Sequence, residues 1–241
     1  ETIFLDATAW LRARLDPNHP DLARAYNSLA ITAWERGDIA RALRLQQQAV
    51  AGWRQSGNTG LLASGLFNQA LILHGAGRDD EALAPAREAL RLRQTGHQPG
   101  LVGDSQRLLG EILWARGEHG AALAMLDAAV RATRAGFGPD HSHTHRAEIA
   151  LARARALQGD QGAMLRLQRL AQPHGDSLEQ RKAAWLARAY AASLECVRQP
   201  RQARLALDAA LTDMQLALPE GGALPREVQQ LRARCGAPAA G

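Results

Sequence analysis

Three histidines alternate along one short segment of the chain, at His141, His143 and His145. Histidines at alternate positions of extended backbone can coordinate a transition metal through their ring nitrogens. The same segment precedes a predicted helix, and Ser142 or Thr144 can cap that helix with a side-chain oxygen. We favour the structural interpretation and expect no bound metal, with a metal site as the alternative.

The chain contains no short motif of the kind that marks an enzyme site. We find no G-x-S-x-G nucleophile turn, no phosphate-binding P-loop, no kinase glycine-rich or catalytic loop and no H-E-x-x-H zinc motif. The glycines of Gly75-Ala76-Gly77 are interpreted as the end of a helix. The sequence therefore predicts a protein that is not an enzyme and that carries no cofactor.

The chain has two cysteines, Cys196 and Cys235. Cys196 lies eleven residues after Trp185 in a predicted helix, and Cys235 lies ten residues after Pro225, where the last predicted helix begins. At a rise of about 1.5 Å per residue, the two thiols fall at a similar level if these helices run side by side. Two interpretations stay open: unrelated free thiols, or a disulfide, which requires Cα atoms within about 7 Å. A disulfide would indicate an oxidising compartment such as the periplasm, and free thiols the cytoplasm.

These residues are carried by a sequence repeat with a period of about 40 residues. The turn glycines are Gly37, Gly77, Gly117 and Gly159, at intervals of 40, 40 and 42 residues (77−37, 117−77 and 159−117). Seven positions before them stand the small residues Ala30, Ala70, Gly110 and Ala152. Aromatic residues make up only 4% of the chain, against 46% hydrophobic residues in all, as in closely packed alanine-rich helices. This pattern is typical of stacked helical hairpins.

The repeat predicts an all-α fold: a right-handed α-solenoid of about five helical hairpins, with a leading half-repeat and a C-terminal capping helix. Residues 1–18 would form the second helix of a truncated leading repeat, residues 19–221 the array, and residues 222–241 the capping helix and a flexible tail. The predicted repeats are residues 19–58, 59–97, 98–141, 142–176 and 177–221. We expect Gly57, Gly96 and Gly136 to end the second helices of the first three hairpins.

Two segments resemble tetratricopeptide repeats of the kinesin-light-chain type: the linker Leu15-Asp16-Pro17-Asn18-His19-Pro20-Asp21 and the helix Ala25-Tyr26-Asn27-Ser28-Leu29-Ala30. A second linker of this kind is Phe137-Gly138-Pro139-Asp140-His141. The segment Pro219-Glu220-Gly221-Gly222 and the helix after it are similar to C-terminal repeat modules of bacterial Ser/Thr kinases. The resemblance implies a solenoid that binds a partner. Only the first repeat keeps the asparagine at its first position, Asn27, so the asparagine ladder that holds extended peptides in many such repeats is incomplete.

In such a stack, one stripe of each first helix, at spacing i, i+3, i+7 and i+10, lines a concave groove. The aromatic and arginine side chains in this stripe favour partner binding, since these residue types dominate interface hot spots. Trp34 and Trp114 have a second interpretation, as packing residues between helices. The stripe also includes Asp104 and Arg153. The residues predicted to bind a partner are Arg24, Asn27, Trp34, Phe67, His74, Arg107, Glu111, Trp114, Arg146 and Arg188.

Charge and hydropathy narrow the class of partner. The formal net charge is +5, the sequence pI is about 10.1, and only one of the 29 Lys+Arg residues, Lys182, is a lysine. The arginines are spread over five repeats, which argues against nucleic acid and leaves an acidic partner as an alternative. No apolar run approaches the ~18 residues of a membrane helix, so we expect no membrane insertion.

The sequence therefore predicts a non-catalytic scaffold that binds a protein or peptide in its groove, as the sensory or docking module of a larger bacterial signalling protein. The arginine-rich composition indicates a bacterial source, and the absence of an initiator methionine indicates a piece of a longer chain. The alternative is a module that senses a small molecule or a short peptide. The sequence gives no indication of the oligomeric state.

Overall fold

The computed structural model describes residues 10, 13–14, 19–172, 175, 177–218 and 222–235. Within these ranges the chain forms eleven helices and no strand, so the all-α prediction is confirmed for them. The predicted leading half-repeat and flexible tail lie outside the described residues, except that Trp10, Ala13 and Arg14 are helical. The helices are α2 (Pro20–Glu35), α3 (Ile39–Gln55), α4 (Thr59–Gly75), α5 (Asp79–Thr95), α6 (Pro99–Ala115), α7 (His119–Phe137), α8 (Ser142–Leu157), α9 (Gln161–Leu170), α10 (Leu178–Glu195), α11 (Pro200–Gln215) and α12 (Ala223–Arg234).

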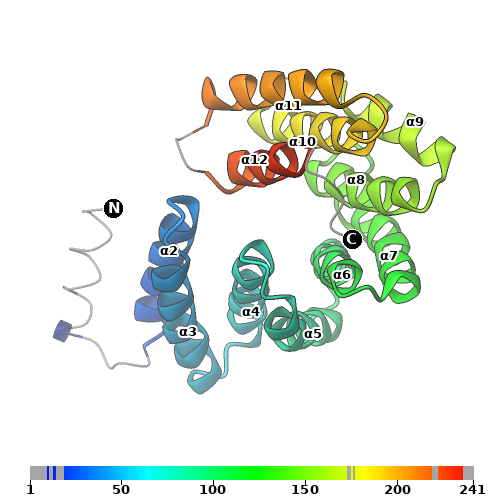
Figure 1. Ribbon diagram of the computed structural model, residues 1–241. Helices are drawn as coiled ribbons and strands as arrows, with labels where there is room; N and C mark the ends of the chain where they lie inside the picture. The colour runs from blue at the N-terminus through cyan, green and yellow to red at the C-terminus, as the bar shows by residue number, and fades with distance from the viewer. Residues whose placement is uncertain are drawn as a thin grey trace.

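The helices form five consecutive hairpins followed by a single helix. α2 packs on α3, α4 on α5, α6 on α7, α8 on α9 and α10 on α11, while α12 packs on both α10 and α11. The first helices of the hairpins also pack on one another in chain order, from α2 to α4, α6, α8 and α10. They form an inner layer that curves around a centre, with the second helices outside it (Figure 1). The helical-repeat solenoid predicted from the sequence is therefore confirmed.

The tight turn inside each of the first four hairpins is made by a predicted glycine. The φ angles of Gly37, Gly77, Gly117 and Gly159 are +82°, +72°, +81° and +89°. Residues with a side chain rarely adopt this left-handed conformation, so each turn requires glycine. The sequence period is thus the spacing of four similar turns.

Polar side chains fix where several helices begin. Asp38, Asn58 and Asp160 each accept a hydrogen bond from the backbone N–H three residues later, at the start of α3, α4 and α9. Ser177 and Gln180 form a capping box at the start of α10. These bonds satisfy backbone donors that have no partner inside their own helix. They fix the residues at which these four helices begin.

The second helices end at the predicted glycines in two of the first three hairpins. Gly57 follows α3 with a φ of +69°, as a C-terminal glycine does. After α5, however, the left-handed residue is His97, with a φ of +53°, whereas Gly96 has a φ of −79°. Gly96 therefore ends α5 as predicted, as its C-cap residue, but His97 makes the left-handed turn.

The sequence predicted that Gly136 ends the second helix of the third hairpin, but α7 continues through Gly136 to Phe137. Gly138, with a φ of +93°, makes the turn instead. Gly136 serves close packing: a Cβ atom at this position would lie 2.1 Å from the backbone nitrogen of Gly100 on α6. The glycine allows the backbones of α6 and α7 to touch.

Small residues also lie where the helices of a hairpin cross. Ala30 and Ala70 are fully buried, at 0% exposure. A Cβ atom on Gly110 of α6 would lie 2.7 Å from Cγ of Leu126 and 3.2 Å from the carbonyl oxygen of Ala122, both on α7. Gly110 therefore has no room for a side chain, and the methyl groups of Ala30 and Ala70 are completely covered by their neighbours.

The first and last described helices of the array meet, so the inner layer closes into a ring (Figure 1). Arg226 of α12 donates hydrogen bonds to the carbonyl oxygens of Trp34 (2.5 Å) and Glu35 (2.8 Å) at the end of α2. In return, the Glu35 carboxylate accepts a hydrogen bond from the backbone N–H of Ala223 (3.0 Å). α12 follows Gly222, which has no capping side chain, so Glu35 supplies the anionic cap from the other end of the array. We call these contacts of Trp34, Glu35, Ala223 and Arg226 the seam.

Candidate functional site

Charged and polar side chains from five helices meet on the inner layer. Their charges are close enough to interact: Glu111 interacts with His74, Arg107 and Arg146, and Arg146 also interacts with Glu227. The residues that we call the inner cluster are His74 on α4, Asp104, Arg107 and Glu111 on α6, Arg146 and Arg153 on α8, Tyr190 on α10 and Glu227 on α12.

Arg107 and Glu111 form a buried ion pair one turn apart on α6. Nη1 of Arg107 donates a 2.6 Å hydrogen bond to Oε2 of Glu111, and the Arg107 side chain is 7% exposed. Burial lowers the pKa of Arg107, but the charges of Glu111 and Asp104 outweigh it and raise that pKa above its usual value. Burial raises the pKa of Glu111, but the charges of Arg107, His74 and Arg146 outweigh it and hold that pKa below its usual value. Each partner therefore stabilises the charge of the other.

Asp104, also on α6, joins three helices. Its Oδ2 atom lies 2.5 Å from Nδ1 of His143 at the start of α8, and its side chain is buried. Burial raises the pKa of Asp104, but the hydrogen bond with His143 and the charges of Arg107 and Arg93 hold it below the usual value. Arg93 of α5 is itself buried, which lowers its pKa to about 10, and it donates a 2.9 Å hydrogen bond to Ser105. These contacts fix α8 against the hairpin before it.

Tyr190 and Glu227 connect the capping helix to the inner layer. The Tyr190 hydroxyl donates a hydrogen bond to Oε1 of Glu227, and the Arg153 guanidinium lies 4.2 Å above the centre of the Tyr190 ring. Burial and then the Glu227 charge raise the pKa of Tyr190 well above its usual value, so its hydroxyl stays protonated as a donor. The Arg153–Tyr190 stack and the Tyr190–Glu227 hydrogen bond together join α8, α10 and α12.

Arg146 of α8 differs from the other arginines of the inner cluster. Its side chain is exposed, and no hydrogen bond or ion pair joins its guanidinium to another residue in the described ranges. The helices around it nevertheless desolvate the guanidinium and lower its pKa, and the charge of Arg107 lowers it further. Arg146 thus lies on a helix of the inner layer with its side chain exposed to solvent.

The first predicted groove residues lie at the start of the ring. Oδ1 of Asn27 accepts hydrogen bonds from Nε2 of Gln46 (3.1 Å) and Nδ2 of Asn68 (3.0 Å). Arg24 is exposed and donates to Asp21 on its own helix (3.3 Å). The Asn27 side-chain oxygen is thus bonded within the fold, between α2, α3 and α4.

Both predicted groove tryptophans are half-buried and have packing partners. Trp34 packs against Gly75 of α4, where a Cβ atom would lie 3.5 Å from the indole Nε1. The Trp114 ring stacks on His119, with ring centres 4.3 Å apart and an angle of 22°. Each ring therefore contributes to packing and keeps part of its surface exposed.

Three further residues predicted for the groove contact side chains of the second helices. The ring of Phe67 lies under the Arg93 guanidinium at 4.4 Å, and Arg188 forms a 3.0 Å ion pair with Asp213 of α11. Nδ1 of His74 lies 2.5 Å from Oδ1 of Asp79 at the start of α5. Of the ten predicted residues, the inner cluster brings together His74, Arg107, Glu111 and Arg146.

The three alternating histidines have separate environments. The ring of His141 accepts a hydrogen bond from the backbone N–H of His143 (3.2 Å), which caps α8, and stacks on Phe137 at 4.7 Å. His143 contacts Asp104, and His145 is buried. Across the residues that the structure describes, no group of three His, Cys, Asp or Glu side chains could hold a metal ion.

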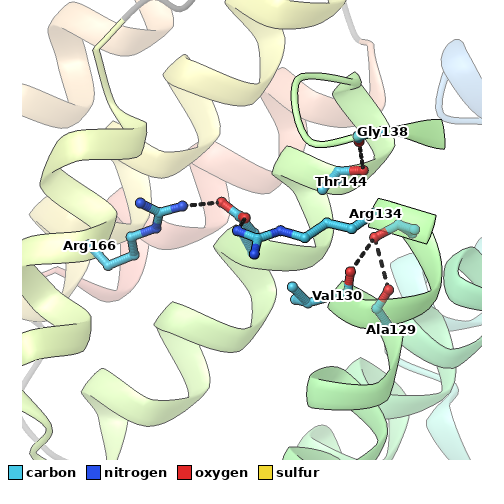
Figure 2. A network of polar contacts seen from close by, with 8 residues as sticks. Ala129, Val130, Arg134, Gly138, Thr144 and Arg166 are labelled. Carbon is cyan, nitrogen blue, oxygen red and sulfur yellow. Dashed lines mark hydrogen bonds and ion pairs between the residues drawn. The ribbon is translucent and has the colours of Figure 1, made fainter. Parts of the chain in front are cut away.

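A second buried carboxylate stabilises the array away from the inner cluster. Glu148 of α8 accepts hydrogen bonds from Arg134 of α7 and from Arg166 of α9, the latter at 2.6 Å. The two arginines approach this carboxylate from opposite sides (Figure 2). At the adjoining loop, the Thr144 hydroxyl donates to the carbonyl oxygen of Gly138 (2.7 Å). The network fixes α8 between its two neighbours.

Cys196 and Cys235 form a disulfide, with an S–S distance of 2.09 Å and a Cα–Cα distance of 5.2 Å. Cys196 directly follows α10 and Cys235 directly follows α12. The bond therefore fixes the C-terminal end of α12 to α10, while the N-terminal end of α12 forms the seam. Of the two interpretations of the cysteines, the structure has the bonded pair.

Sequence reasoning does not assign Tyr190 or Glu227 to the site. The fifth repeat has no turn glycine to align its stripe, and the residue predicted from it is Arg188, two positions before Tyr190. Glu227 lies on the capping helix, which has no counterpart in the repeat pattern. The sequence signal that could have indicated them is a carboxylate on the capping helix, Glu227, together with a tyrosine on the first helix of the fifth hairpin, Tyr190.

No described helix has both the length and the apolar character that a membrane span requires. Two small depressions lie on the array, one lined by residues such as Thr59, Arg93 and Gln98 and the other by residues such as Arg44 and Gln69. Neither is lined by Arg107, Glu111 or Arg146.

Comparison with known proteins agrees with this architecture. Residues 1–55 and residues 102–143 each match a family model described as tetratricopeptide repeat. No curated protein matches the chain. The two matches fall on the beginning of the chain and on the α6–α7 hairpin with the linker that follows it.

Several solved structures share the fold. Kinesin light chain TPR-like repeats from Podosopora anserina are 19% identical, with a TM-score of 0.57 over 90% of this chain and 99% of that chain. A Rap protein complexed with competence and sporulation factor is 13% identical, with a TM-score of 0.62 over 96% of this chain and 68% of that chain. The apo form of RapI is 13% identical, with a TM-score of 0.65 over 97% and 68%. The chain therefore contains tetratricopeptide (TPR) repeats in the two matched segments, and its fold is shared with kinesin light chain TPR-like repeats.

Proposed function

We propose that this chain is a non-catalytic scaffold that binds a peptide or protein partner on the inner face of its ring. On this proposal it is the sensory or docking module of a larger bacterial signalling protein. The fold supports the proposal, because helical repeats build extended concave surfaces from neighbouring units. One structural neighbour, a Rap protein, was solved in complex with competence and sporulation factor, so a related array holds a bound partner.

The observation that carries the proposal is the inner cluster. Side chains from α4, α6, α8, α10 and α12 converge there, and they combine buried ion pairs with the exposed guanidinium of Arg146. The packing of the helices does not account for Arg146, because a guanidinium that neighbouring helices partly desolvate is unfavourable without a hydrogen-bond partner. A ligand that supplies hydrogen bonds and charge there would compensate the desolvation.

The ring also favours a second candidate, a sensor of a short peptide or small molecule. The seam joins α2 to α12, so the helices of the inner layer follow one another around a ring. On this candidate, a short ligand binds the inner face and leaves the seam intact. A folded partner would have to present a thin segment.

The disulfide supports an oxidising compartment outside the cytoplasm, because such bonds persist mainly where thiols are not kept reduced. A periplasmic or otherwise extracytoplasmic sensor is therefore the localisation that we propose. Thiol titration of protein isolated from its native cells under alkylating conditions tests this. Two free thiols would contradict it.

Partner binding is tested with immobilised wild-type chain and two arginine variants, Arg146→Ala on the inner face and Arg87→Ala on α5. Arg87 is exposed and serves as the matched outer control. Peptides and proteins captured from a bacterial extract are identified by mass spectrometry, and each is then titrated as a purified ligand by calorimetry. We expect a ligand that loses affinity with Arg146→Ala and not with Arg87→Ala. A ligand that responds only to Arg87→Ala would place the binding face outside the ring.

A further inference from the structure

We propose that the depression beside Arg93 is a binding site for phosphate, either as the free inorganic ion or as the monoester group of a small molecule. The depression lies between the second and third hairpins, and no residue of the inner cluster lines it. The inference therefore goes beyond the proposed function and does not depend on it. We call this depression the Arg93 site.

The Arg93 site lies where the ends of three helices meet. Thr59 and Gly60 begin α4, Thr95 ends α5, and Gln98 directly precedes α6. All four of these residues are exposed, so the site opens to solvent. Its volume is about 140 Å³. A single water molecule occupies roughly 30 Å³ in the liquid, so the site has room for an ion of the size of phosphate.

Arg93 is a buried cation whose hydrogen-bond donors are only partly used. The residue is 6% exposed and lines the site. Its Nη1 atom donates to the carbonyl oxygen of Leu101 (3.1 Å) and to Oγ of Ser105 (2.9 Å). The Nε atom is buried and has no hydrogen-bond partner, and Nη2 donates to no residue that the structure describes. Buried polar groups normally have partners, so these donors indicate a missing acceptor.

No carboxylate contacts the Arg93 guanidinium in the part of the chain that the structure describes. Its face lies 4.4 Å above the centre of the Phe67 ring. The charge of Asp104 acts on it from a greater distance, but Asp104 contacts His143 and also interacts with Arg107. Burial therefore lowers the pKa of Arg93 to about 10 in spite of Asp104. A buried cation without a contacting anion is unfavourable, and an anion in the site would compensate it.

The first turn of α4 supplies a second set of donors to the same site. Thr59 and Gly60 are the first two residues of this helix, and their N–H groups have no partner within it. The Asn58 side chain caps the next N–H group, that of Leu61, at 3.0 Å. A Cβ atom on Gly60 would meet only Oδ1 of Asn58 within 4 Å, so the backbone here is open to a ligand. Free N–H groups and the helix dipole favour anions at such a helix end.

These donors match a tetrahedral oxyanion better than a carboxylate. The guanidinium of Arg93 can bind two oxygens of one anion, as arginine does with phosphate groups. The Thr59 hydroxyl and the N–H groups of α4 are then available to the remaining oxygens. A carboxylate has only two oxygens and would leave one set of donors unused. At pH 7 a phosphate monoester also carries about 1.5 to 2 negative charges, which strengthens its attraction to a cation and a helix N-terminus.

The test titrates four ligands into the full chain by isothermal calorimetry at constant ionic strength: inorganic phosphate, phosphoserine, sulfate and acetate. The proteins are the wild type and two site variants, Arg93→Lys, which keeps the charge and removes the planar fork, and Thr59→Ala, which removes the hydroxyl. The matched controls are Arg87→Gln, at an exposed arginine of α5, and Thr212→Ala, at an exposed threonine of α11. All variants are compared with the wild type by circular dichroism and thermal melting. Because Thr59 is exposed, Thr59→Ala decides the test if Arg93→Lys does not fold.

We expect saturable phosphate binding to the wild type that is about tenfold weaker in Arg93→Lys and about threefold weaker in Thr59→Ala, because each variant loses hydrogen bonds to a charged group. Both controls should bind as the wild type does, and acetate should bind more weakly than phosphate. Binding of phosphoserine as tight as that of phosphate would assign the site to a monoester, and binding of phosphate alone would assign it to the free ion. No saturable binding to the wild type, or binding that neither site variant weakens, would overturn the site. Tighter binding of acetate than of phosphate would overturn phosphate as its ligand.

Discussion

Arg226 donates a 2.8 Å hydrogen bond to the carbonyl oxygen of Glu35, a residue 191 positions earlier in the chain. The two residues lie on the last and first described helices of the array, and their contact converts a linear stack of hairpins into a ring. TPR arrays hold together through contacts between neighbouring repeats, so a bond across the whole array adds a constraint that the repeats do not supply.

We expect Arg226→Ala to open the seam. The variant loses charge-assisted bonds to the end of α2, which contribute about 1–2 kcal/mol to the free energy of unfolding at a partly exposed site. Hydrogen exchange should rise in the last turn of α2 and the first turn of α12. Arg234→Ala, at the exposed end of the same helix, is the control and should leave exchange at α2 unchanged. Unaltered exchange in Arg226→Ala would show that the seam is held by other contacts.

Two glycines of α7 should respond oppositely to the same substitution. Gly136→Ala places a Cβ atom 2.1 Å from the backbone of Gly100, so α6 and α7 must separate, and we expect a loss of about 3 kcal/mol. Gly120→Ala meets no atom within 4 Å and should stabilise the helix by about 0.5–1 kcal/mol. Urea unfolding of both variants measures the difference. Equal effects of the two substitutions would contradict the close approach of the helices.

Reduction of the disulfide should destabilise the capping helix. The bond closes a segment of 39 residues, for which the chain-entropy model gives about 4 kcal/mol. We expect a reductant to lower the melting temperature and to increase hydrogen exchange along α12, including its seam residues. The double variant Cys196→Ala and Cys235→Ala is the control and should melt at the same temperature with or without reductant. If the melting temperature of the wild type is the same with and without reductant, the disulfide does not stabilise α12.

Stability should fall in acid through Asp104 and Glu111. Both carboxyl groups have a lower pKa in the folded chain than in the unfolded one, where the values are about 3.9 and 4.3. Their contribution is therefore fully present above about pH 5 and is lost as the pH falls through the folded-state values. Asp104→Asn and Glu111→Gln should each be less stable at pH 7 by about 2 kcal/mol, and each should show a flatter dependence of melting temperature on pH below about 4. A wild-type profile as flat as that of the variants would exclude this linkage.

The fold could be predicted from the sequence because the backbone conformation of its tight turns requires glycine. A left-handed turn in each hairpin requires glycine, so Gly37, Gly77, Gly117 and Gly159 mark the hairpins directly. Gly136 shows the limit of this reasoning: the sequence does not distinguish a glycine that ends a helix from one that lets two helices touch. The difference depends on Gly100, which lies on another helix.

The site was predictable only in part. Helical spacing places Arg107, Glu111 and Arg146 on one stripe, but it does not show that Arg107 is buried and bonded to Glu111. For this reason Arg107→Ala is expected to destabilise the fold as well as any ligand complex. Tyr190 and Glu227 enter the site through the packing of α12, and the seam depends on Arg226 meeting a residue from the other end of the chain. No local pattern encodes a contact over that separation.

The seam also has a consequence for the order in which the chain folds. Hairpins form from residues close in sequence, so their loops close at little entropic cost, whereas the bonds from α12 to α2 join residues 188 to 192 positions apart. These bonds become favourable only after every intervening hairpin has docked on the one before it. Ring closure is then the final step of folding and the first to reverse, and a chain emerging from the ribosome exists as an open arc until its last helix is made.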